Sequence, residues 1–444
     1  MITKDAILKA VKEQNVKYID LWFTDILGGI KSVTVPAARV ETALDYGTHV
    51  DGSSLDGSAR VAESDMLLIP DMDTFMVLPW TTDDELTARM ICTVHTPQGE
   101  PFIGDPRVAL INAMEEANKL GFTFKTGVEM EFFLFKTDAN NLPIISSYQD
   151  NAGYFDLSED KAQRVRRNML TTLDQIGICA ESTHSEIGYG QHEIDFHYDA
   201  ALASADKLMT SRVAIKSVAQ QHDLHCTFMP RPLAHLPGSG MHTHQSLHDA
   251  KSDENIFVDK NHEYGLSETA RYFLAGQLAH ARAITAIVAP LVNSYKRLGT
   301  SFEAPVYVSW AHVNRAALIR IPSNSPGKES HTRLELRCPD PSSNPYLAFA
   351  VMLHAGLDGI KQRMELPAPL EESLLMQRRH RLRQVESLPA SLGDALEALR
   401  QDDVILSALG AYISDRYLEA KRQEYDEYNR YVTQWELDHY LTRY

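Results

Sequence analysis

Residues 127–135 read GVEMEFFLF, and this stretch sets the kind of fold that we expect. Side chains of a β-strand repeat every two residues, so the spacing places Glu129 and Glu131 together on one face of a strand. The same spacing groups His242, His244 and Ser246 in GMHTHQSL. These alternating segments predict strands that border a polar site.

A third alternating segment, TRLELRC at residues 332–338, carries charges of both signs. Arg333, Glu335 and Arg337 fall on one face of the expected strand, and the residues between them fall on the other. Such a strand faces a charged site. From about residue 342 onward helical patterns dominate, including NPYLAFAVMLHAGLDGI. The class that we expect is therefore α+β.

The segment TPQGEPFIGDPR, residues 96–107, is rich in proline and glycine and separates the first hundred residues from the rest. It ends in a helix start, where Asp105 is the expected N-cap and Pro106 fits the first helical position. Because 444 residues are many for a single domain, we predict two, spanning residues 1–102 and 103–444.

Composition narrows the class of partner. The net charge of −17 comes without a compensating basic tract, which argues against nucleic acid and anionic membranes as partners. The N-terminus has no apolar core of a secretory signal, and no uncharged run is long enough to span a bilayer. The four cysteines form no CxxC pair. We expect a soluble, cytoplasmic protein with free thiols.

Carboxylates on short strand-like or turn-like segments are the first chemical signal. Crowded carboxylates repel one another and desolvate at a cost of several kcal/mol unless a cation lies between them. Oxygen ligands suit Mg²⁺ or Mn²⁺, and His242 could add one nitrogen ligand. The alternative for each residue is a solvated surface glutamate. The candidates are Glu129, Glu131, Glu186, Glu193 and Glu335.

Arginines are the second signal, because a guanidinium offers a fixed fork for carboxylate and phosphate oxygens. They suit a reaction that moves a phosphoryl group onto an acid, although ion pairs at a subunit interface are the alternative. No GxxxxGK[ST] or GxGxxG motif occurs, so any ATP site is of another kind. A structural zinc held by His242 and His244 lacks further ligands at suitable spacing. The arginines are Arg297, Arg315, Arg320, Arg333 and Arg337.

Taken together, these segments resemble the glutamine synthetase family, in its shorter bacterial type, over almost the whole chain. The resemblance implies a small N-terminal β-grasp-like domain, a larger catalytic domain built on an antiparallel sheet, and a ring-based dodecamer with sites completed by a neighbouring subunit. It also implies an ATP-dependent ligase that joins an amine to L-glutamate. The matching stretches are VDGSSLDG, ESDMLLIPD, GVEMEFFLF, HSEIGYGQHEIDF, FMPRPLAHLPGSGMHTHQSL, NSYKRLGTSFEAP, NRAALIRIP and RLELRCPDPSSNPYLAFAVMLHAGLDGI.

The resemblance also assigns roles to single positions. One metal ion is expected at Glu131, Glu186 and Glu193, and another at Glu129, His242 and Glu335. Glutamate is expected at Glu131, Arg297, Arg337 and the backbone of Gly238, and ATP at His244, Ser246 and Lys328. Arg315 and Arg320 balance charge on the phosphoryl oxygens, and the product of that step is γ-glutamyl phosphate.

The amine that attacks this acyl phosphate is expected in a cation pocket, with Asp51 as the proton acceptor. Glu303 lies on a flap that shields the acyl phosphate from water. The pocket residues are Asp51, Ser54, Tyr154, Glu186 and Glu303.

Two positions depart from the family pattern. Pro237 stands where an asparagine usually precedes the glycine of the GSGMH motif, and the flap reads RLGTSFEAP where Pro-Gly-Tyr usually precedes the glutamate. The flap thus gains Ser301 and Phe302, which adds apolar surface near the amine and favours methylamine. Ammonia remains open, because the flap changes are also compatible with an ordinary glutamine synthetase.

Two further alternatives are weaker. Polyamine ligases share the PGS sequence at Pro237 but tend to lack the flap glutamate, which stands here as Glu303. Relatives that have lost catalysis have broken metal ligands, whereas every expected position is filled here. Arg60 resembles an arginine of feedback control in the shorter bacterial type, but we predict no effector.

Overall fold

The computed structural model describes most of the 444 residues. The described ranges are 2–52, 65–148, 153–156, 161–299, 304–325, 327–371 and 385–444. Ser54, Arg60, Ser301, Phe302 and Glu303 lie outside them.

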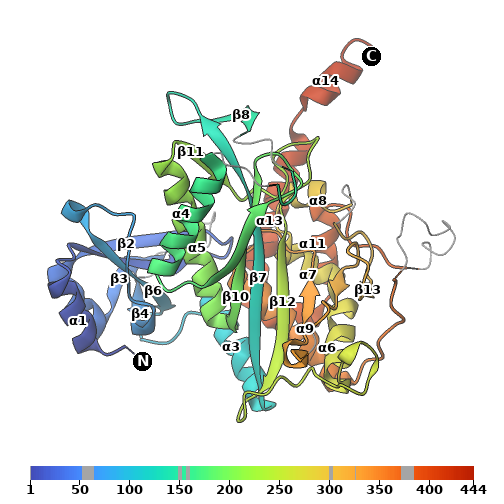
Figure 1. Ribbon diagram of the computed structural model, residues 1–444, viewed down its shortest axis with the longest axis horizontal. Helices are drawn as coiled ribbons and strands as arrows, with labels where there is room; N and C mark the ends of the chain where they lie inside the picture. Colours follow the sequence, from blue (N-terminus) through green and yellow to red (C-terminus); the bar gives the residue numbers. More distant parts are fainter. Residues whose placement is uncertain are drawn as a thin grey trace.

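The first hundred residues build a small sheet with its own core (Figure 1). Its strand order is β2-β1-β6-β4-β3, with β5 paired to β6, and β1 runs parallel to β6. Two helices accompany it, and Ile7, Ile19 and Met90 lie in the core that is separate from that of the large sheet. The elements are α1 (Lys4–Glu13), β1 (Tyr18–Thr24), β2 (Ile30–Pro36), α2 (Val40–Tyr46), β3 (Thr48–Asp51), β4 (Asp65–Pro70), β5 (Met76–Val77) and β6 (Thr87–His95).

Helix α3 (Pro106–Lys119) begins where the sequence predicts it. The Asp105 side chain accepts a hydrogen bond from Arg107 N at 2.8 Å, and Pro106 occupies the first turn, where its missing N–H has no helical partner to lose. The prediction of this helix start is confirmed. The placement of the domain boundary at residues 102 and 103 stays a prediction.

The large sheet has the order β13-β14-β15-β12-β7-β10-β9, and β8 and β11 both pair with β7. Its pairs are antiparallel except β13 with β14. The strands are β7 (Phe122–Thr137), β8 (Pro143–Tyr148), β9 (Ala180–Ser185), β10 (Gln191–Ala200), β11 (Leu224–Thr227), β12 (Met241–Asp249), β13 (Trp310–Ala311), β14 (Ile319–Arg320) and β15 (Leu334–Leu336). The strand predicted over residues 332–338 is therefore present, but it is limited to Leu334–Leu336.

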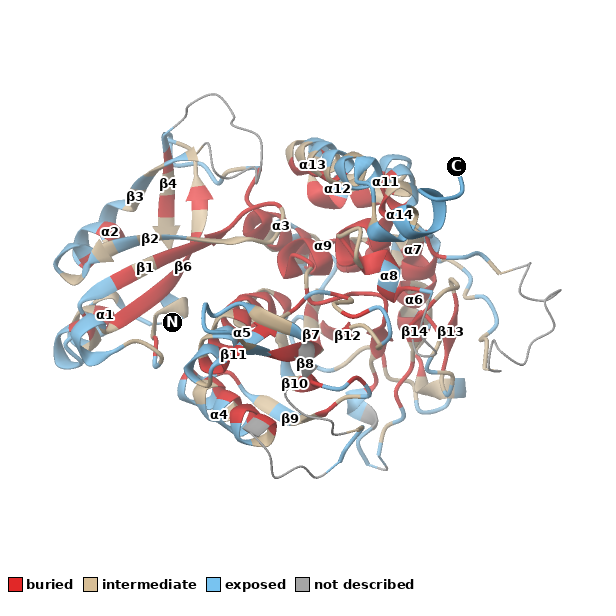
Figure 2. Cartoon of the chain, turned by 90° about the horizontal axis from the view of Figure 1, so that it is seen from above, coloured by how far each residue is buried: buried red, intermediate tan, exposed pale blue. Residues whose placement is uncertain are grey.

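Alternation along β7 separates the core from the polar face. Val128, Met130 and Phe132 join the main hydrophobic core, whereas Glu129 and Glu131 alternate with them and point to the other face. Helices cover the core face, and Figure 2 shows α3 and α9 (Pro345–Gln362) buried between the sheet and the C-terminal helices. The sheet thereby leaves its carboxylate-bearing face free for a site.

The remaining helices complete the core and the C-terminal end. Helix α9 packs closely on α6, since a Cβ on Gly276 would lie 2.1 Å from Ala355 O. No described helix is long and apolar enough to cross a membrane, and all four cysteines are free. The helices are α4 (Lys161–Gln175), α5 (Ala201–Gln221), α6 (Glu268–Ala279), α7 (Ala281–Val288), α8 (Ser294–Arg297), α11 (Leu392–Arg400), α12 (Asp403–Leu409), α13 (Ala411–Arg430) and α14 (Gln434–Tyr440).

Candidate active site

Strand register brings together carboxylates that are far apart in the sequence. Glu131 on β7 lies directly opposite Glu193 on β10, and Glu129 lies opposite His242 on β12. One strand farther, His244 on β12 lies opposite Glu335 on β15. Directly opposite residues on neighbouring antiparallel strands have Cβ atoms about 4.5–5.5 Å apart. The predicted site residues of four strands therefore share one surface.

Two groups on this surface could each hold a metal ion. Glu129, His242 and Glu335 form one, and Glu131, Glu193 and His242 form the other, with one ligand atom of each residue within 4.8 Å of the rest of its group. His242 lies between the groups: Nδ1 is 3.0 Å from Glu129 Oε2, and Nε2 is 3.9 Å from Glu131 Oε1. A third group of the same kind, His184, Glu193 and Asp195, adjoins the second.

The electrostatics of these groups fit a divalent cation. Burial raises the pKa of Glu193 to about 12, with further contributions from repulsion by Glu131, Glu129 and Glu186. Burial also opposes ionisation of Glu129, but hydrogen bonds from His242 and His244 hold its pKa well below the usual value. A carboxylate that must otherwise take up a proton is relieved by a cation, and oxygen donors with a single imidazole suit Mg²⁺ or Mn²⁺.

Glu186 is positioned differently from the other acidic candidates. Its Oε2 accepts a hydrogen bond from Ile187 N at 3.0 Å, and its Oε1 lies 3.7 Å from His184 Nδ1. Among the described residues, it belongs to none of the three groups, although it lines the same cavity as Glu131. The structure thus brings Glu131 and Glu193 together, whereas the Glu186 carboxylate contacts Ile187 N and His184 near its own position in the chain.

Two of the predicted arginines flank the Glu335 carboxylate, which is fully buried. Arg320 Nε donates to Glu335 Oε2 at 2.5 Å, and Arg337 donates to Glu335 Oε1. Arg297 points elsewhere, because its guanidinium donates to the backbone carbonyls of residues 337–339 at 2.9–3.0 Å. Two cations beside one carboxylate offset its desolvation, and they keep positive charge beside the metal-ligand groups.

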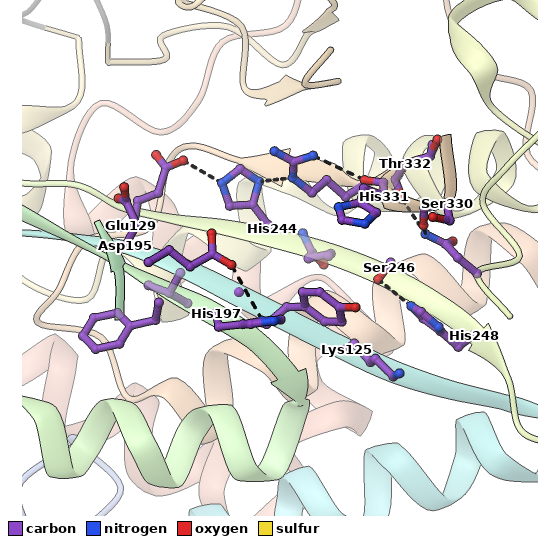
Figure 3. A pocket seen from close by; sticks show the side chains of 18 residues that line it. Lys125, Glu129, Asp195, His197, His244, Ser246, His248, Ser330, His331 and Thr332 are labelled. Atoms are coloured by element: carbon purple, nitrogen blue, oxygen red, sulfur yellow. Dashed lines mark hydrogen bonds and ion pairs between the residues drawn. The ribbon is translucent and has the colours of Figure 1, made fainter. Parts of the chain in front are cut away.

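Two cavities, each of about 310 Å³, adjoin the metal-ligand groups. The first is shown in Figure 3, where the imidazole of His244 lies between the Glu129 carboxylate and the guanidinium of Arg333. The other includes Glu131, His242, Gly238, Arg297 and Arg337 in its lining. We name them the His244 cavity and the Gly238 cavity. Ser246, Lys125 and Asp195 also line the His244 cavity.

The remaining predicted residues are spread more widely. Tyr154 has its ring 5.5 Å from that of His184 and hydrogen-bonds Arg315, which is exposed. Lys328 is exposed in a turn and donates its backbone N–H to Ser325 O at 3.0 Å. Asp51 ends β3 in the N-terminal sheet and lines neither cavity. Ser54 and Glu303 belong to the undescribed ranges.

Sequence reasoning missed three residues of the site: Gln191, His184 and Asp195. Gln191 is 1% exposed and donates to Glu131 Oε2 at 2.8 Å. A signal for it and for Asp195 was present, because both lie two residues from Glu193 and therefore share its face of a strand. His184 is likewise two residues from Glu186.

Comparisons with known proteins agree over both domains. Residues 15–97 match the model of the glutamine synthetase beta-Grasp domain, and residues 103–440 match that of the glutamine synthetase catalytic domain. The chain is 47% identical to a glutamine synthetase of Thermotoga maritima, over 99% of this chain and 100% of the relative. It is 48% identical to a glutamine synthetase of Thermus thermophilus, over 100% and 99% of the two chains.

Two solved structures of GmaS, a gamma-glutamylmethylamide synthetase, share the fold. Its complex with ADP superimposes with a TM-score of 0.88 at 32% identity, and its form without ligand with 0.86 at 33%; both matches cover 98% of this chain and 99% of the other. The predicted α+β class, with its β-grasp and catalytic domains, is thereby confirmed. The chain belongs to the glutamine synthetase family of ADP-forming carbon–nitrogen ligases.

Proposed function

We propose that this chain joins a small amine to the γ-carboxylate of L-glutamate through γ-glutamyl phosphate, and that the amine is methylamine. The observation that carries the ligase proposal is the position of His242. It lies between two carboxylate groups that could hold metal ions and that adjoin two separate cavities. Two substrates in those cavities would meet at the metal-ligand groups, as a transfer of a phosphoryl group requires.

The two cavities suit different substrates. The Gly238 cavity offers Arg297, Arg337 and the Gly238 backbone, and we assign L-glutamate to it. The His244 cavity offers His244, Ser246 and Lys125, and we assign ATP to it. Mg²⁺ or Mn²⁺ held by Glu129, Glu131, Glu193, His242 and Glu335 would supply Lewis-acid stabilisation of the phosphate oxygens, and the resemblance adds Glu186 as a further ligand.

The reaction then has two displacements. An oxygen of the glutamate γ-carboxylate attacks the γ-phosphorus of ATP, and the bond to the ADP oxygen breaks. Asp51 next accepts one proton from the bound ammonium group, the freed amine nitrogen attacks the acyl carbon, and the bond to phosphate breaks, with the second proton leaving on the phosphate as HPO₄²⁻. Arg320, which is held beside the site by Glu335, balances charge on the phosphoryl oxygens together with Arg315.

The choice of methylamine rests on apolar surface near the proposed amine pocket. The Phe155 ring lies 4.8 Å from the ring of His184 and 4.0 Å from that of Tyr154, and His184 Nδ1 is 3.7 Å from Glu186 Oε1. An apolar ring packed on the histidine that itself contacts the Glu186 carboxylate suits a cation that carries a methyl group. The predicted contribution of Phe302 on the flap points the same way, whereas Glu303 fits ammonium and methylammonium equally.

Ammonia is the second candidate, and the comparisons favour it. The identity to proteins named glutamine synthetase is 47–48%, whereas the identity to GmaS is 32–33%. One methyl group changes recognition by only about 1–3 kcal/mol, so both amines can be substrates at different rates. A dodecamer with sites between subunits and a cytoplasmic location remain predictions.

Steady-state kinetics test the proposal. The purified protein is given L-glutamate, MgATP and either ammonium or methylamine, and both phosphate and amide are measured across amine concentrations. We expect a higher kcat/KM for methylamine. If kcat/KM is higher for ammonium, ammonia takes the place of methylamine as the proposed substrate. If an assembled oligomer forms no amide with any amine, the result supports a non-catalytic protein.

A further inference from the structure

Gln191 occupies a position that couples the two halves of the candidate site. It is the first residue of β10 and follows the turn that joins β9 to β10, and its side chain is almost completely buried, with 1% of it exposed. Glu186 and Glu193 stand on either side of this turn. A buried amide that leaves hydrogen-bonding capacity unused is destabilising, so its partners indicate what fixes it in place.

Three hydrogen bonds determine the orientation of the Gln191 amide. Oε1 accepts from Gly188 N at 3.2 Å, and Nε2 donates to Glu131 Oε2 at 2.8 Å and to Gly238 O at 3.1 Å. The reverse orientation would set an NH₂ against a backbone N–H and an oxygen against two acceptors. Hydrogen-bonding groups on three segments of the chain therefore hold the Gln191 amide in a single orientation.

The first consequence concerns the Glu131 carboxylate. Its Oε2 accepts from both Gln191 Nε2 and Gly240 N, the latter at 3.0 Å. Its Oε1 is left on the side of His242, with 3.9 Å between Oε1 and Nε2. Gln191 and the Gly240 backbone thus together determine which of the two Glu131 oxygens faces the metal-ligand group.

The second consequence concerns the backbone at Gly238. The Gly238 carbonyl is held by Gln191, and the Cα of this glycine is enclosed, since an added Cβ would lie 2.3 Å from Pro230 O and 2.9 Å from Arg297 Cγ. The same amide group therefore orients a proposed metal ligand and the loop to which we assign glutamate.

We infer that Gln191 is a positioning residue that couples metal binding at Glu131 to glutamate binding at Gly238. This inference rests on the proposed function for the identity of the two ligands. Residues that orient metal ligands through hydrogen bonds typically change metal affinity or activity by about 10–100-fold when they are replaced. Gln191→Met keeps the volume and removes both donated hydrogen bonds.

Binding measurements without ATP or amine test the coupling separately from catalysis. Free Mn²⁺ is measured by electron paramagnetic resonance during titration of the full-length protein, with and without L-glutamate. We expect Gln191→Met to weaken Mn²⁺ binding about 10-fold or more. In the wild type, the coupling predicts that L-glutamate tightens Mn²⁺ binding. We expect Gln191→Met to abolish this tightening and to raise the KM for glutamate more than the KM for ATP.

Gly188→Ala provides a second variant that retains Gln191. A Cβ at position 188 would lie 2.6 Å from Gln191 Oε1, so the amide has to move although its chemistry is unchanged. It is expected to change Mn²⁺ binding in the same direction. If Gln191→Met fails to fold, Gly188→Ala still tests whether the position of the Gln191 amide controls Mn²⁺ binding.

Gln277→Met is the matched control for loss of a buried amide. Gln277 is fully buried on α6, where its Nε2 donates to Gln245 Oε1 and Met352 O, neither of which belongs to a proposed metal or glutamate ligand. We expect it to lower the melting temperature while leaving Mn²⁺ affinity within about twofold of the wild type. Loss of stability alone therefore does not mimic the predicted effect.

A double-mutant cycle identifies the route of the effect. In a Glu131→Ala background, Gln191→Met is expected to cause no further loss of Mn²⁺ affinity, because it acts through that carboxylate. If the folded Gln191→Met and Gly188→Ala variants bind Mn²⁺ and glutamate as tightly as the wild type, the inference is overturned. If the wild type instead forms no amide in the kinetic assay, the proposed function fails while the Mn²⁺ titration still tests the coupling.

Discussion

His242 lies directly opposite Glu129 on neighbouring antiparallel strands, and its Nδ1 is 3.0 Å from Glu129 Oε2. In the tautomer that has its proton on Nδ1, the imidazole donates to Glu129, and the lone pair of Nε2 faces Glu131. One side chain thus connects the two carboxylate groups through its two nitrogens. Its removal should affect metal binding more than folding.

His242→Asn is the first prediction. The asparagine amide can still donate to Glu129 but leaves the position of Nε2 empty. We expect Mn²⁺ affinity to fall at least about 10-fold and kcat to fall about 100-fold or more, because the metal has lost a direct ligand. Isothermal titration calorimetry and initial rates measure the two quantities.

His225→Asn is the control for this variant. His225 lies on β11, which also pairs with β7, but it lines neither cavity. Metal affinity in His225→Asn should equal that of the wild type. Unchanged Mn²⁺ binding in His242→Asn would exclude His242 as a ligand.

Glu335→Gln is the second prediction. The Glu335 carboxylate is fully buried between the guanidinium groups of Arg320 and Arg337. Removal of one partner from a buried ion pair typically costs about 3–5 kcal/mol, because the remaining charge is buried without compensation. We expect a clear fall in melting temperature, measured by scanning fluorimetry without ligands.

Glu181→Gln separates this effect from a general loss of negative charge. Glu181 lies on β9 and is exposed, so its replacement should leave the melting temperature nearly unchanged. A melting temperature for Glu335→Gln as high as that of the wild type would contradict the stabilising role of the buried carboxylate.

The period-two pattern predicted which residues share a face, and the structure agrees for Glu129 with Glu131 and for His242 with His244. It could not predict that Glu131 faces Glu193, because the two residues are 62 positions apart in the sequence and the order of strands depends on packing across the whole sheet. The sequence pattern could also not predict that the Arg297 guanidinium donates to the carbonyls of residues 337–339, because these residues are about 40 positions away. The local pattern therefore predicts which face of a strand a side chain occupies, whereas the pairing of distant strands determines which residues lie beside it.

His280 gives a third, pH-dependent prediction away from the site. Its Nδ1 is 2.7 Å from Asp402 Oδ2, and its Nε2 is 3.2 Å from Asp358 Oδ2. Burial by itself lowers the pKa of His280, but the hydrogen bonds and charges of Asp402 and Asp358 raise it above the usual 6.5. A raised pKa means that the ion pairs stabilise the fold fully below pH 6.5, and that this contribution is lost as pH rises through the pKa of the folded protein.

Asp402→Asn tests this contribution without loss of the helix cap. Asp402 Oδ1 accepts from Ile405 N at the start of α12, and asparagine caps a helix equally well. We expect the variant to melt below the wild type at pH 5.5 and the difference to shrink at pH 9. Asp403→Asn, in the same helical turn, is the control, and an Asp402→Asn deficit that is equal at both pH values would rule out titration of His280.

The fourth prediction concerns Glu303, which the resemblance places on the flap. An acyl phosphate in water hydrolyses without forming amide, so a ligase must exclude water until the amine attacks. In Glu303→Ala, we expect more than one ADP for each amide formed, because water reaches the acyl phosphate. Parallel assays of ADP and amide at saturating amine measure this ratio.

The ratio distinguishes a shield from an amine ligand. If Glu303 only attracts the ammonium group, its loss raises the KM for the amine but leaves one ADP per amide at saturation. If Glu303 also shields the acyl phosphate, excess ADP persists at every amine concentration, and omission of the amine leaves a glutamate-dependent ATPase. Glu303→Gln keeps the size of the side chain without its charge, so a ratio restored to one in that variant assigns shielding to the shape of the residue. A ratio of one in Glu303→Ala itself would remove the shielding role.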